Sequence, residues 1–135
     1  MLVVDTNIIA PLFVRSALSD AVQALHERDH VWQTEPVALI EFSNLLSTFE
    51  RARYVTAAMA RECLGRAEAF LQPHLFSVTH EAALKIALRH RIAACDARFL
   101  ALADQLGSRL VTEDAKLRAA APALTQSLAE ALAIA

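Results

Sequence analysis

Short apolar runs and longer stretches with helical spacing alternate along the chain. Runs rich in β-forming residues occupy positions 2–4, 30–34, 75–78 and 109–112, and we predict a strand at each. Each run is followed by at least one stretch long enough to form a helix. Strands that alternate with helices favour a parallel sheet that is covered on both faces and joined by right-handed crossovers.

Apolar residues at spacings of three and four predict the helices. Thr56 and Thr79 can cap a helix, Pro36 suits a first helical turn, and Gly107 suits the position just after a helix end. The C-terminal segment has no clear pattern, although its alanine-rich end favours a helix. The expected helices lie at 6–14, 16–28, about 36–53, from Thr56 to before Pro73, after Thr79, from Asp96 to Gly107, and at about 114–119.

This pattern predicts an α/β fold, namely a three-layer α/β/α sandwich around a four- to five-stranded, mainly parallel sheet. The chain has 135 residues, of which 56% are hydrophobic, and this is enough for one substantial core. No stretch is enriched in the Ser, Gly or Pro typical of a linker. We therefore expect residues 1–135 to form a single domain.

The formal net charge of −2 argues against a protein that holds nucleic acid by a general positive field, so any RNA contact has to be local or mediated by metal ions. Polar residues interrupt every apolar stretch well before the roughly 20 residues that a membrane-spanning helix needs. Cys63 and Cys95 lack the CxxC spacing of a metal or redox site, and we expect buried thiols rather than a disulfide. These features favour a cytoplasmic protein.

Asp5 and Asp114 lie at or just beyond the carboxyl ends of predicted strands. In an open parallel sheet, ligands bind at the edge that these strand ends form. Each residue could instead simply cap the helix that follows, a role that Asp fills well and that is worth about 1 kcal/mol. Asp96, which precedes the stretch that carries Phe99 and Leu102, is open to the same two interpretations.

Glu41 is harder to explain as a structural residue. On a helix it shares a face with Val37, Leu45 and Thr48, and no Lys or Arg lies within one turn of it. A carboxylate among apolar neighbours needs a partner, and a bound cation would supply one. Oxygen ligands without a set of His or Cys favour Mg²⁺, with Mn²⁺ as a substitute, and Mg²⁺ commonly works beside substrate phosphates.

Four segments of the sequence resemble the PIN domain family. They are LVVDTNII at 2–9, PVALIEFSNLL at 36–46, CDARFLALA at 95–103 and LVTEDAKL at 110–117, and each contributes one of the acidic residues described above. The resemblance covers nearly the whole chain, whose length is most similar to the VapC-type toxins of bacterial toxin–antitoxin pairs. It implies an α/β/α fold, a Mg²⁺ pocket, endonucleolytic cleavage of RNA, a homodimer and inhibition by a cognate antitoxin.

The resemblance also implies roles for individual residues. The proposed metal ligands and catalytic residues are the acidic quartet Asp5, Glu41, Asp96 and Asp114, with Thr112 and Asn7 as polar support. Thr6 is expected to start a helix. Cys95 departs from the family pattern, in which an aromatic residue often precedes the acid, and this departure could alter the local packing.

Contacts to an RNA backbone would have to come from basic residues near these motifs. Arg89, Arg91, Arg98 and Lys116 are the candidates, since an Arg can bind a phosphate through two donors at once. Most exposed arginines are ordinary solvated surface, so each candidate has a plain structural explanation as well. Trp32 lies in a predicted strand, where packing in the core is a better explanation than stacking on a base.

Two other functions fit parts of the pattern. A Mg²⁺-dependent phosphatase or phospho-acceptor domain of related architecture also places an Asp at the end of its first strand, but the residue two positions after Asp5 is Asn7 rather than a second acid. A non-catalytic PIN-fold binding module would use the acidic pocket to hold an Arg-bearing partner. The presence of all four acids favours the nuclease.

Overall fold

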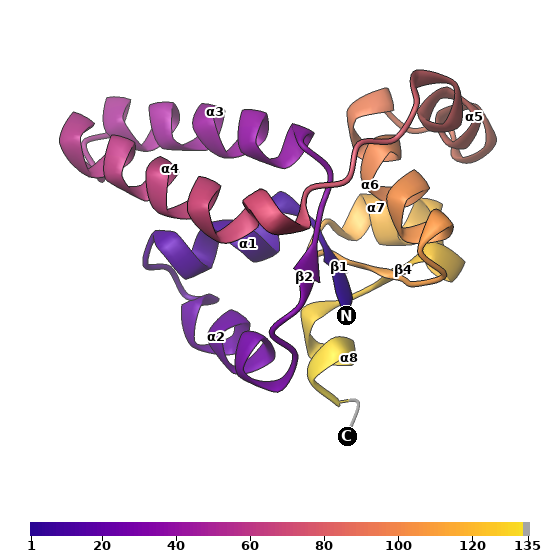
Figure 1. Ribbon diagram of the computed structural model, residues 1–135, viewed down its shortest axis with the longest axis horizontal. Coiled ribbons are helices and arrows are strands. Elements are labelled where there is room, and N and C mark those ends of the chain that lie inside the picture. Colours follow the sequence, from indigo (N-terminus) through magenta and orange to yellow (C-terminus); the bar gives the residue numbers. More distant parts are fainter. Residues whose placement is uncertain (134–135) are drawn as a thin grey trace.

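The computed structural model describes residues 1–133 and is centred on a sheet of four parallel strands. The strands are β1 (Leu2–Val4), β2 (Trp32–Gln33), β3 (Leu110–Val111) and β4 (Thr125–Gln126), and they lie in the order β2, β1, β3, β4 (Figure 1). Val3 of β1 is paired with Gln33 on one side and with Leu110 on the other. The predicted α/β class and parallel sheet are confirmed.

Eight α-helices connect and cover the strands within residues 1–133. As predicted, the side chains of Thr56 and Thr79 cap two of them by accepting hydrogen bonds from the backbone N–H groups of Met59 and Ala82. None of the helices in this part of the chain combines the length and the apolar character needed to span a bilayer. The helices are α1 (Thr6–Phe13), α2 (Ser19–Arg28), α3 (Val37–Arg51), α4 (Ala57–Leu71), α5 (His80–His90), α6 (Ala94–Gln105), α7 (Ala115–Ala120) and α8 (Leu128–Ala133), with 3₁₀ turns η1 (Gln72–His74) and η2 (Pro122–Leu124).

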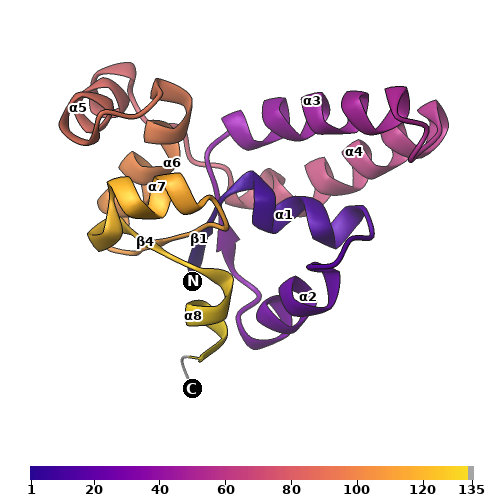
Figure 2. The ribbon, with the colours of Figure 1, turned by 180° about the vertical axis from the view of Figure 1, so that it is seen from behind.

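Helices lie on both sides of the sheet, which gives the predicted three layers. α1 and α2 lie on one side, whereas α6 and α7 lie on the other (Figures 1 and 2). α3 and α4 run side by side beyond the sheet and pack against α1, while α5 packs on α6. α1 begins just after β1, and α7 begins a few residues after β3. The carboxyl ends of these two strands therefore lie between the helices on the two sides of the sheet.

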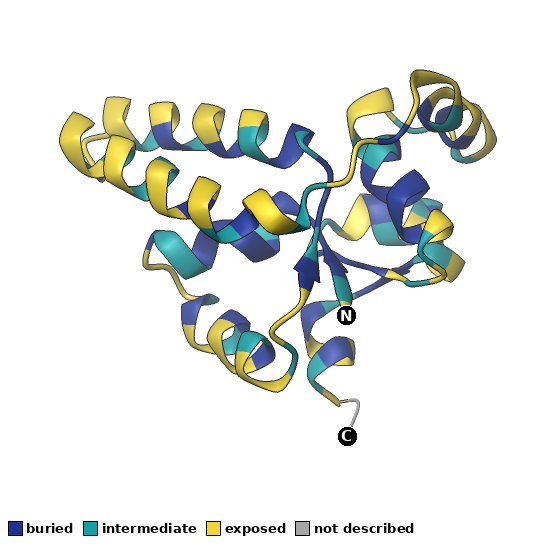
Figure 3. Cartoon of the chain, in the orientation of Figure 1, coloured by how far each residue is buried: buried dark blue, intermediate teal, exposed yellow. Residues whose placement is uncertain are grey.

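The core is built on the strands. Val3, Val4, Trp32, Leu110 and Val111 are all fully buried, so the prediction that Trp32 packs in the core is confirmed. Figure 3 shows buried residues along the sheet and on the inner faces of the helices, while the outer faces of α3 and α4 are exposed. Each large apolar side chain buried in this way contributes about 1.5–3 kcal/mol. This packing holds the carboxyl ends of β1 and β3 side by side.

Two strand predictions differ from the structure. Residues 75–78 form no strand: Leu75 makes a single bridge to Thr34, and the chain then leaves the sheet toward α5. The backbone N–H of Phe76 still donates to the carbonyl of Thr34 at 2.9 Å, but the Phe76 side chain is 40% exposed. Conversely, β4 was not predicted, because Thr125 and Gln126 are polar and the strand is only two residues long. Both side chains are nevertheless buried.

Smaller predictions also need correction. Asp96 does not precede its helix, because α6 begins two residues earlier, at Ala94. The expectation of two buried thiols is wrong for Cys95, which is exposed because the start of α6 faces solvent; Cys63 is partly buried, and both cysteines are free. The favoured C-terminal helix is present as α8, and residues 134–135 lie outside the described part of the chain.

Candidate active site

The four acidic residues singled out in the sequence line a single pocket. Asp5, Glu41, Asp96 and Asp114 come from the end of β1, from α3, from the first turn of α6 and from the residue that caps α7. The pocket has a volume of about 380 Å³, and Thr6, Asn7, Asn44, Leu45 and Thr48 complete its lining. Residues far apart in the sequence thus share one cavity at the carboxyl edge of the sheet.

Asp5 is held rigidly at the end of β1. Its backbone N–H donates to the carbonyl of Val111 at 3.0 Å, which continues the ladder between β1 and β3. Its side chain caps α1, because Oδ1 accepts a 2.6 Å hydrogen bond from the backbone N–H of Thr6. Oδ2 accepts a 2.7 Å bond from the hydroxyl of Thr112. The capping role and a place in the pocket are therefore compatible, since one carboxylate serves both.

Asp5 is costly to ionise in this position. Burial raises the pKa of Asp5 to about 6, although the hydrogen bonds from Thr112 and Thr6 oppose this rise. The charges of Glu41 and Asp96 raise the pKa further, because each disfavours a second negative charge nearby. A strongly perturbed carboxyl group at a cavity is a common property of functional sites.

Glu41 contacts the start of α1 rather than a basic side chain. Its Oε1 accepts a 2.6 Å hydrogen bond from the hydroxyl of Thr6, the first residue of α1. Burial raises the pKa of Glu41, the bond from Thr6 opposes this, and the charge of Asp96 adds to the rise. Thr6 was expected only to start a helix, so its second role as a partner of Glu41 was missed. Thr6 lies directly after Asp5, and this adjacency was the available signal.

Asp96 and Asp114 occupy the side of the pocket formed by α6 and α7. Burial raises the pKa of Asp96, and the nearby charge of Asp114 raises it further. Asp114 caps α7, because its Oδ1 accepts hydrogen bonds from the backbone N–H groups of Lys116 and Leu117 at 3.0 and 3.1 Å. The cap uses only Oδ1, so the second carboxylate oxygen of Asp114 is available to the pocket.

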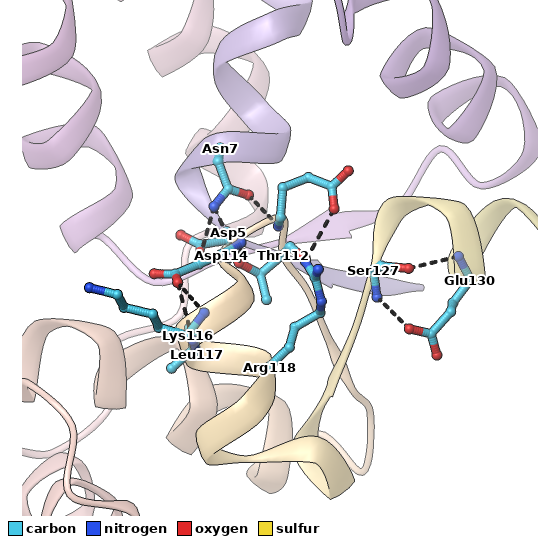
Figure 4. A network of polar contacts seen from close by, with 10 residues as sticks. Asp5, Asn7, Thr112, Asp114, Lys116, Leu117, Arg118, Ser127 and Glu130 are labelled. Atoms are coloured by element: carbon cyan, nitrogen blue, oxygen red, sulfur yellow. Dashed lines mark hydrogen bonds and ion pairs between the residues drawn. The ribbon is translucent and has the colours of Figure 1, made fainter.

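Thr112 and Asn7 connect the two strand ends that carry Asp5 and Asp114 (Figure 4). The Thr112 hydroxyl donates to Asp5 and accepts from the backbone N–H of Asp114 at 3.1 Å. The Asn7 amide donates to Asp5 at 3.4 Å and to the Thr112 hydroxyl at 3.2 Å, and its Oδ1 accepts from the backbone N–H of Glu113 at 3.0 Å. Thr112 and Asn7 thus form one hydrogen-bond network with Asp5 and the backbone of residues 113 and 114.

The basic residues considered for RNA contacts lie elsewhere. No Lys, Arg or His is found among the residues that line the pocket in the described part of the chain. Arg89, Arg91 and Lys116 are exposed, as ordinary surface residues are. Arg98 is a correction to the prediction, because it is largely buried in an ion pair with Glu35 at 2.6 Å. This pair could not be predicted from local patterns, since its members are 63 residues apart.

The donor set of the pocket fits a hydrated Mg²⁺ or Mn²⁺ ion. Carboxylate, hydroxyl and amide oxygens are the ligands that such hard cations prefer, and no basic residue balances the acids among the described residues of the lining. Within residues 1–133, no three His, Cys, Asp or Glu side chains form a ready-made ligand cluster. Mg²⁺ usually keeps several waters and binds directly to only one or two carboxylates.

A second cavity of about 460 Å³ adjoins the acidic pocket and is mainly apolar. The two cavities share Asn7 and Leu45, and the apolar one continues along α1 and α3 to Phe49 and Tyr54. None of the described residues that line it is acidic.

Comparison with known proteins assigns the family. A family model described as "PIN domain" matches residues 2–122. The chain belongs to the PIN domain family. Among curated proteins, this PIN domain is similar to one named Ribonuclease VapC3 from Pyrobaculum aerophilum, at 29% identity over 126 residues, which cover 91% of this chain and 96% of that protein. The fold is also similar to the crystal structure of PAE2754 from Pyrobaculum aerophilum, with a TM-score of 0.76 and 19% identity over 97% of this chain and 92% of that one.

The match confirms the resemblance read from the four sequence motifs. All four acids lie within residues 2–122, so the whole pocket belongs to the matched region. At 19% identity the structural similarity supports the α/β fold alone.

Proposed function

We propose that this PIN domain is a Mg²⁺-dependent endoribonuclease of the VapC type and acts as the toxin of a type II toxin–antitoxin pair. The observation that carries the proposal is that Asp5, Glu41, Asp96 and Asp114 line one pocket without a basic residue in its described lining. Family membership and the similarity to Ribonuclease VapC3 support the same conclusion. An RNA phosphodiester, itself an anion, needs a cation before it can enter such a pocket.

Asp5 and Asp96 are the first choices for holding the ion, either directly or through bound water. Glu41 and Asp114 would hold a second ion or orient the attacking water. When bound, Mg²⁺ supplies a water of lowered pKa and offsets the charge of the phosphate. The carboxylates are not nucleophiles in this scheme, and Thr112 and Asn7 keep Asp5 in place through their hydrogen bonds.

A raised pKa such as that of Asp5 is expected of a cation-binding carboxylate when no cation is bound. Without the ion, burial and the charges of Glu41 and Asp96 make ionised Asp5 unfavourable. A cation reverses this effect, because an opposite charge favours the ionised form. Protons and metal ions therefore compete for the site, and we expect metal-dependent cleavage to decline as the pH falls below about 6.

We extend the proposal to partners, because the family resemblance implies them. RNA is the substrate, a cognate antitoxin protein is the inhibitor, the active form is a homodimer, and the protein works in the cytoplasm. Residues 1–135 fold as one domain, and Mn²⁺ can replace Mg²⁺ because it shares the preference for oxygen ligands.

The two alternatives predict different chemistry at the same pocket. In a phospho-acceptor domain Asp5 would attack a phosphate and a second acid nearby would assist. Here Asn7 takes the position two residues later, and its amide is engaged with Thr112 and Glu113. A binding module would hold an Arg-bearing partner in the pocket and would cleave nothing.

Incubation of the purified protein with total RNA, with Mg²⁺ or with EDTA, separates these functions. We expect internal cleavage of RNA that depends on Mg²⁺, and its loss in well-folded Asp5→Asn and Asp96→Asn variants, which keep side-chain size but remove charge. Release of inorganic phosphate from a small phosphomonoester would favour the phosphatase. Undiminished RNA cleavage by both variants would refute the assignment of the site.

A further inference from the structure

A buried ion pair lies outside the acidic pocket and is unused by the function proposed above. Glu35 is only 1% exposed, and its Oε2 accepts a 2.6 Å hydrogen bond from Nε of Arg98, whose side chain is also largely buried. Neither residue lines the acidic pocket. Desolvation of the two charges opposes their Coulomb attraction, so a buried ion pair adds little to the stability of a protein. The burial of this pair therefore needs another explanation.

Glu35 fixes the beginning of α3. It follows Thr34, whose hydroxyl donates to the carbonyl of Val4 at 2.8 Å at the end of β1. Its Oε1 accepts a 2.8 Å hydrogen bond from the backbone N–H of Val37, the first residue of α3. Glu41 lies six residues after Glu35, in the first half of α3. The Glu35 carboxylate therefore helps to set the position of α3, the helix that carries Glu41 and forms one wall of the acidic pocket.

Arg98 fixes the first turn of α6 in the same network. Its Nη2 donates to the carbonyl of Val78 at 2.7 Å, and its Nη1 lies 3.2 Å from Nδ1 of His80, at the start of α5. Glu35 accepts a longer, 3.5 Å bond from the backbone N–H of Val78. Asp96 lies two residues before Arg98 on α6. The pair thus joins α3, α6 and the segment before α5 at one point.

The two walls that this pair connects carry like charges. Glu41 on α3 and Asp96 on α6 face the same pocket, and the charge of Asp96 disfavours ionised Glu41. Figure 1 shows α3 and α6 on opposite sides of the segment that leads from η1 to α5. Without a bound cation, repulsion between the carboxylates favours separation of the walls. The attraction between Glu35 and Arg98 opposes that separation.

We propose that Glu35 and Arg98 are positioning residues of the acidic pocket, and that their ion pair sets the spacing of Glu41 and Asp96 for a divalent cation. This inference rests on the proposed function. Arg suits the task better than Lys, because its planar fork reaches Glu35, Val78 and His80 in three directions.

The test compares Arg98→Met, Arg98→Lys and Glu35→Gln with the wild type. Affinity for Mn²⁺ is measured by calorimetric titration, and kcat and KM are measured for cleavage of one RNA. For Arg98→Met and Glu35→Gln we expect Mn²⁺ to bind about 10-fold more weakly or worse, as is common when partners of metal ligands are lost. We expect kcat to fall with little change in KM, and Arg98→Lys to recover part of the affinity.

A matched control separates positioning from plain loss of stability. Val22 is fully buried on α2 and lines neither cavity described above. Val22→Ala should lower the thermal midpoint but leave the Mn²⁺ affinity of the folded protein unchanged. If Val22→Ala weakens Mn²⁺ binding as much as Arg98→Met does, stability explains both results and the proposal is overturned.

The remaining outcomes keep this inference distinct from the proposed function. Wild-type affinity in folded Arg98→Met and Glu35→Gln overturns the positioning role and leaves the nuclease intact. If Arg98→Met does not fold, Glu35→Gln and Arg98→Lys decide the question in the same way. Failure of the wild type to bind Mn²⁺ or to cleave RNA overturns the proposed function, and this inference with it.

Discussion

The hydroxyl group of Thr112 donates a 2.7 Å hydrogen bond to Oδ2 of Asp5 across 107 positions of the sequence. The hydroxyl oxygen of Thr112 also accepts a hydrogen bond from the backbone N–H of Asp114 at 3.1 Å. Thr112 is fully buried, so a water molecule cannot readily take over either bond. One side chain therefore couples two members of the acidic quartet and holds them in position before any ion arrives.

Val has nearly the same shape as Thr but no hydroxyl, so Thr112→Val tests the hydrogen bonds of Thr112 with little change in packing. Thr112→Val leaves Oδ2 of Asp5 with only the longer bond from Asn7 and removes the acceptor of the Asp114 backbone N–H, and this costs roughly 1–3 kcal/mol of unfolding free energy. The pKa of Asp5 should rise further, because the bond from Thr112 lowers it. Urea unfolding and RNA cleavage check both effects. Thr112→Ser keeps the hydroxyl and should retain most activity; equal losses in the Ser and Val variants would contradict the role of the bond.

The raised pKa of Asp5 predicts how the stability of the metal-free protein depends on pH. A pKa of about 6 in the folded state, against about 4 when unfolded, means that the folded protein binds more protons between these values. Stability therefore falls as the pH rises through this window, and the cost of ionising Asp5 reaches roughly 3 kcal/mol above it. Asp5→Asn removes this cost, so its stability relative to the wild type should increase from pH 4 to pH 7.

Urea unfolding in EDTA at several pH values measures this difference. Asp20→Asn is the matched control, because Asp20 is an exposed partner of Arg15 and does not line the pocket. Its stability should follow the wild-type pH dependence. A constant offset between Asp5→Asn and the wild type over the whole range would show that Asp5 titrates normally.

A divalent cation should stabilise the folded protein. An ion present at 100 times its Kd adds about 2.7 kcal/mol if it binds the folded state alone. Thermal unfolding with and without Mg²⁺ measures this gain, and Asp96→Asn should abolish most of it. Glu113→Gln is a control from the same stretch as Asp114, since Glu113 pairs with Arg118 and does not line the pocket. Equal stabilisation of both variants would rule out a site at Asp96.

The bond from Thr6 to Glu41 predicts a shift in the pH dependence of cleavage. The Thr6 hydroxyl lowers the pKa of Glu41, against the effect of burial. Thr6→Val should raise this pKa and move the acidic limb of the pH–rate profile to higher pH, because ionised Glu41 then requires a higher pH. Thr6→Ser should restore the wild-type profile. An unchanged limb in Thr6→Val would show that Glu41 does not need to be ionised.

The position of the acids could be predicted from the sequence because strand ends of a parallel sheet converge. Asp5 and Asp114 follow apolar runs that could only be buried strands, and Glu41 lacked a local partner on its helix. Capping and a place in the pocket are compatible for Asp5 and Asp114, because both cap a helix with one carboxylate oxygen and also line the pocket.

The features that were missed depend on contacts between distant segments. Arg98 was a candidate for RNA contacts and Glu35 was not singled out, and only the folded chain places the two side chains together in the interior. β4 is too short and too polar to produce a strand pattern, and its pairing with β3 is what buries Thr125 and Gln126. Local periodicity contains no information about such pairings.

Mn²⁺ titration, followed by electron paramagnetic resonance, tests most directly whether the four carboxylates share a cation. The wild type is compared with Asp5→Asn, Glu41→Gln, Asp96→Asn and Asp114→Asn, with Glu113→Gln as the control. We predict tight binding by the wild type and the control, and binding weakened at least about 10-fold in Asp5→Asn and Asp96→Asn. Equal Mn²⁺ affinity in all six folded proteins would contradict the account, because no ion could then depend on this pocket.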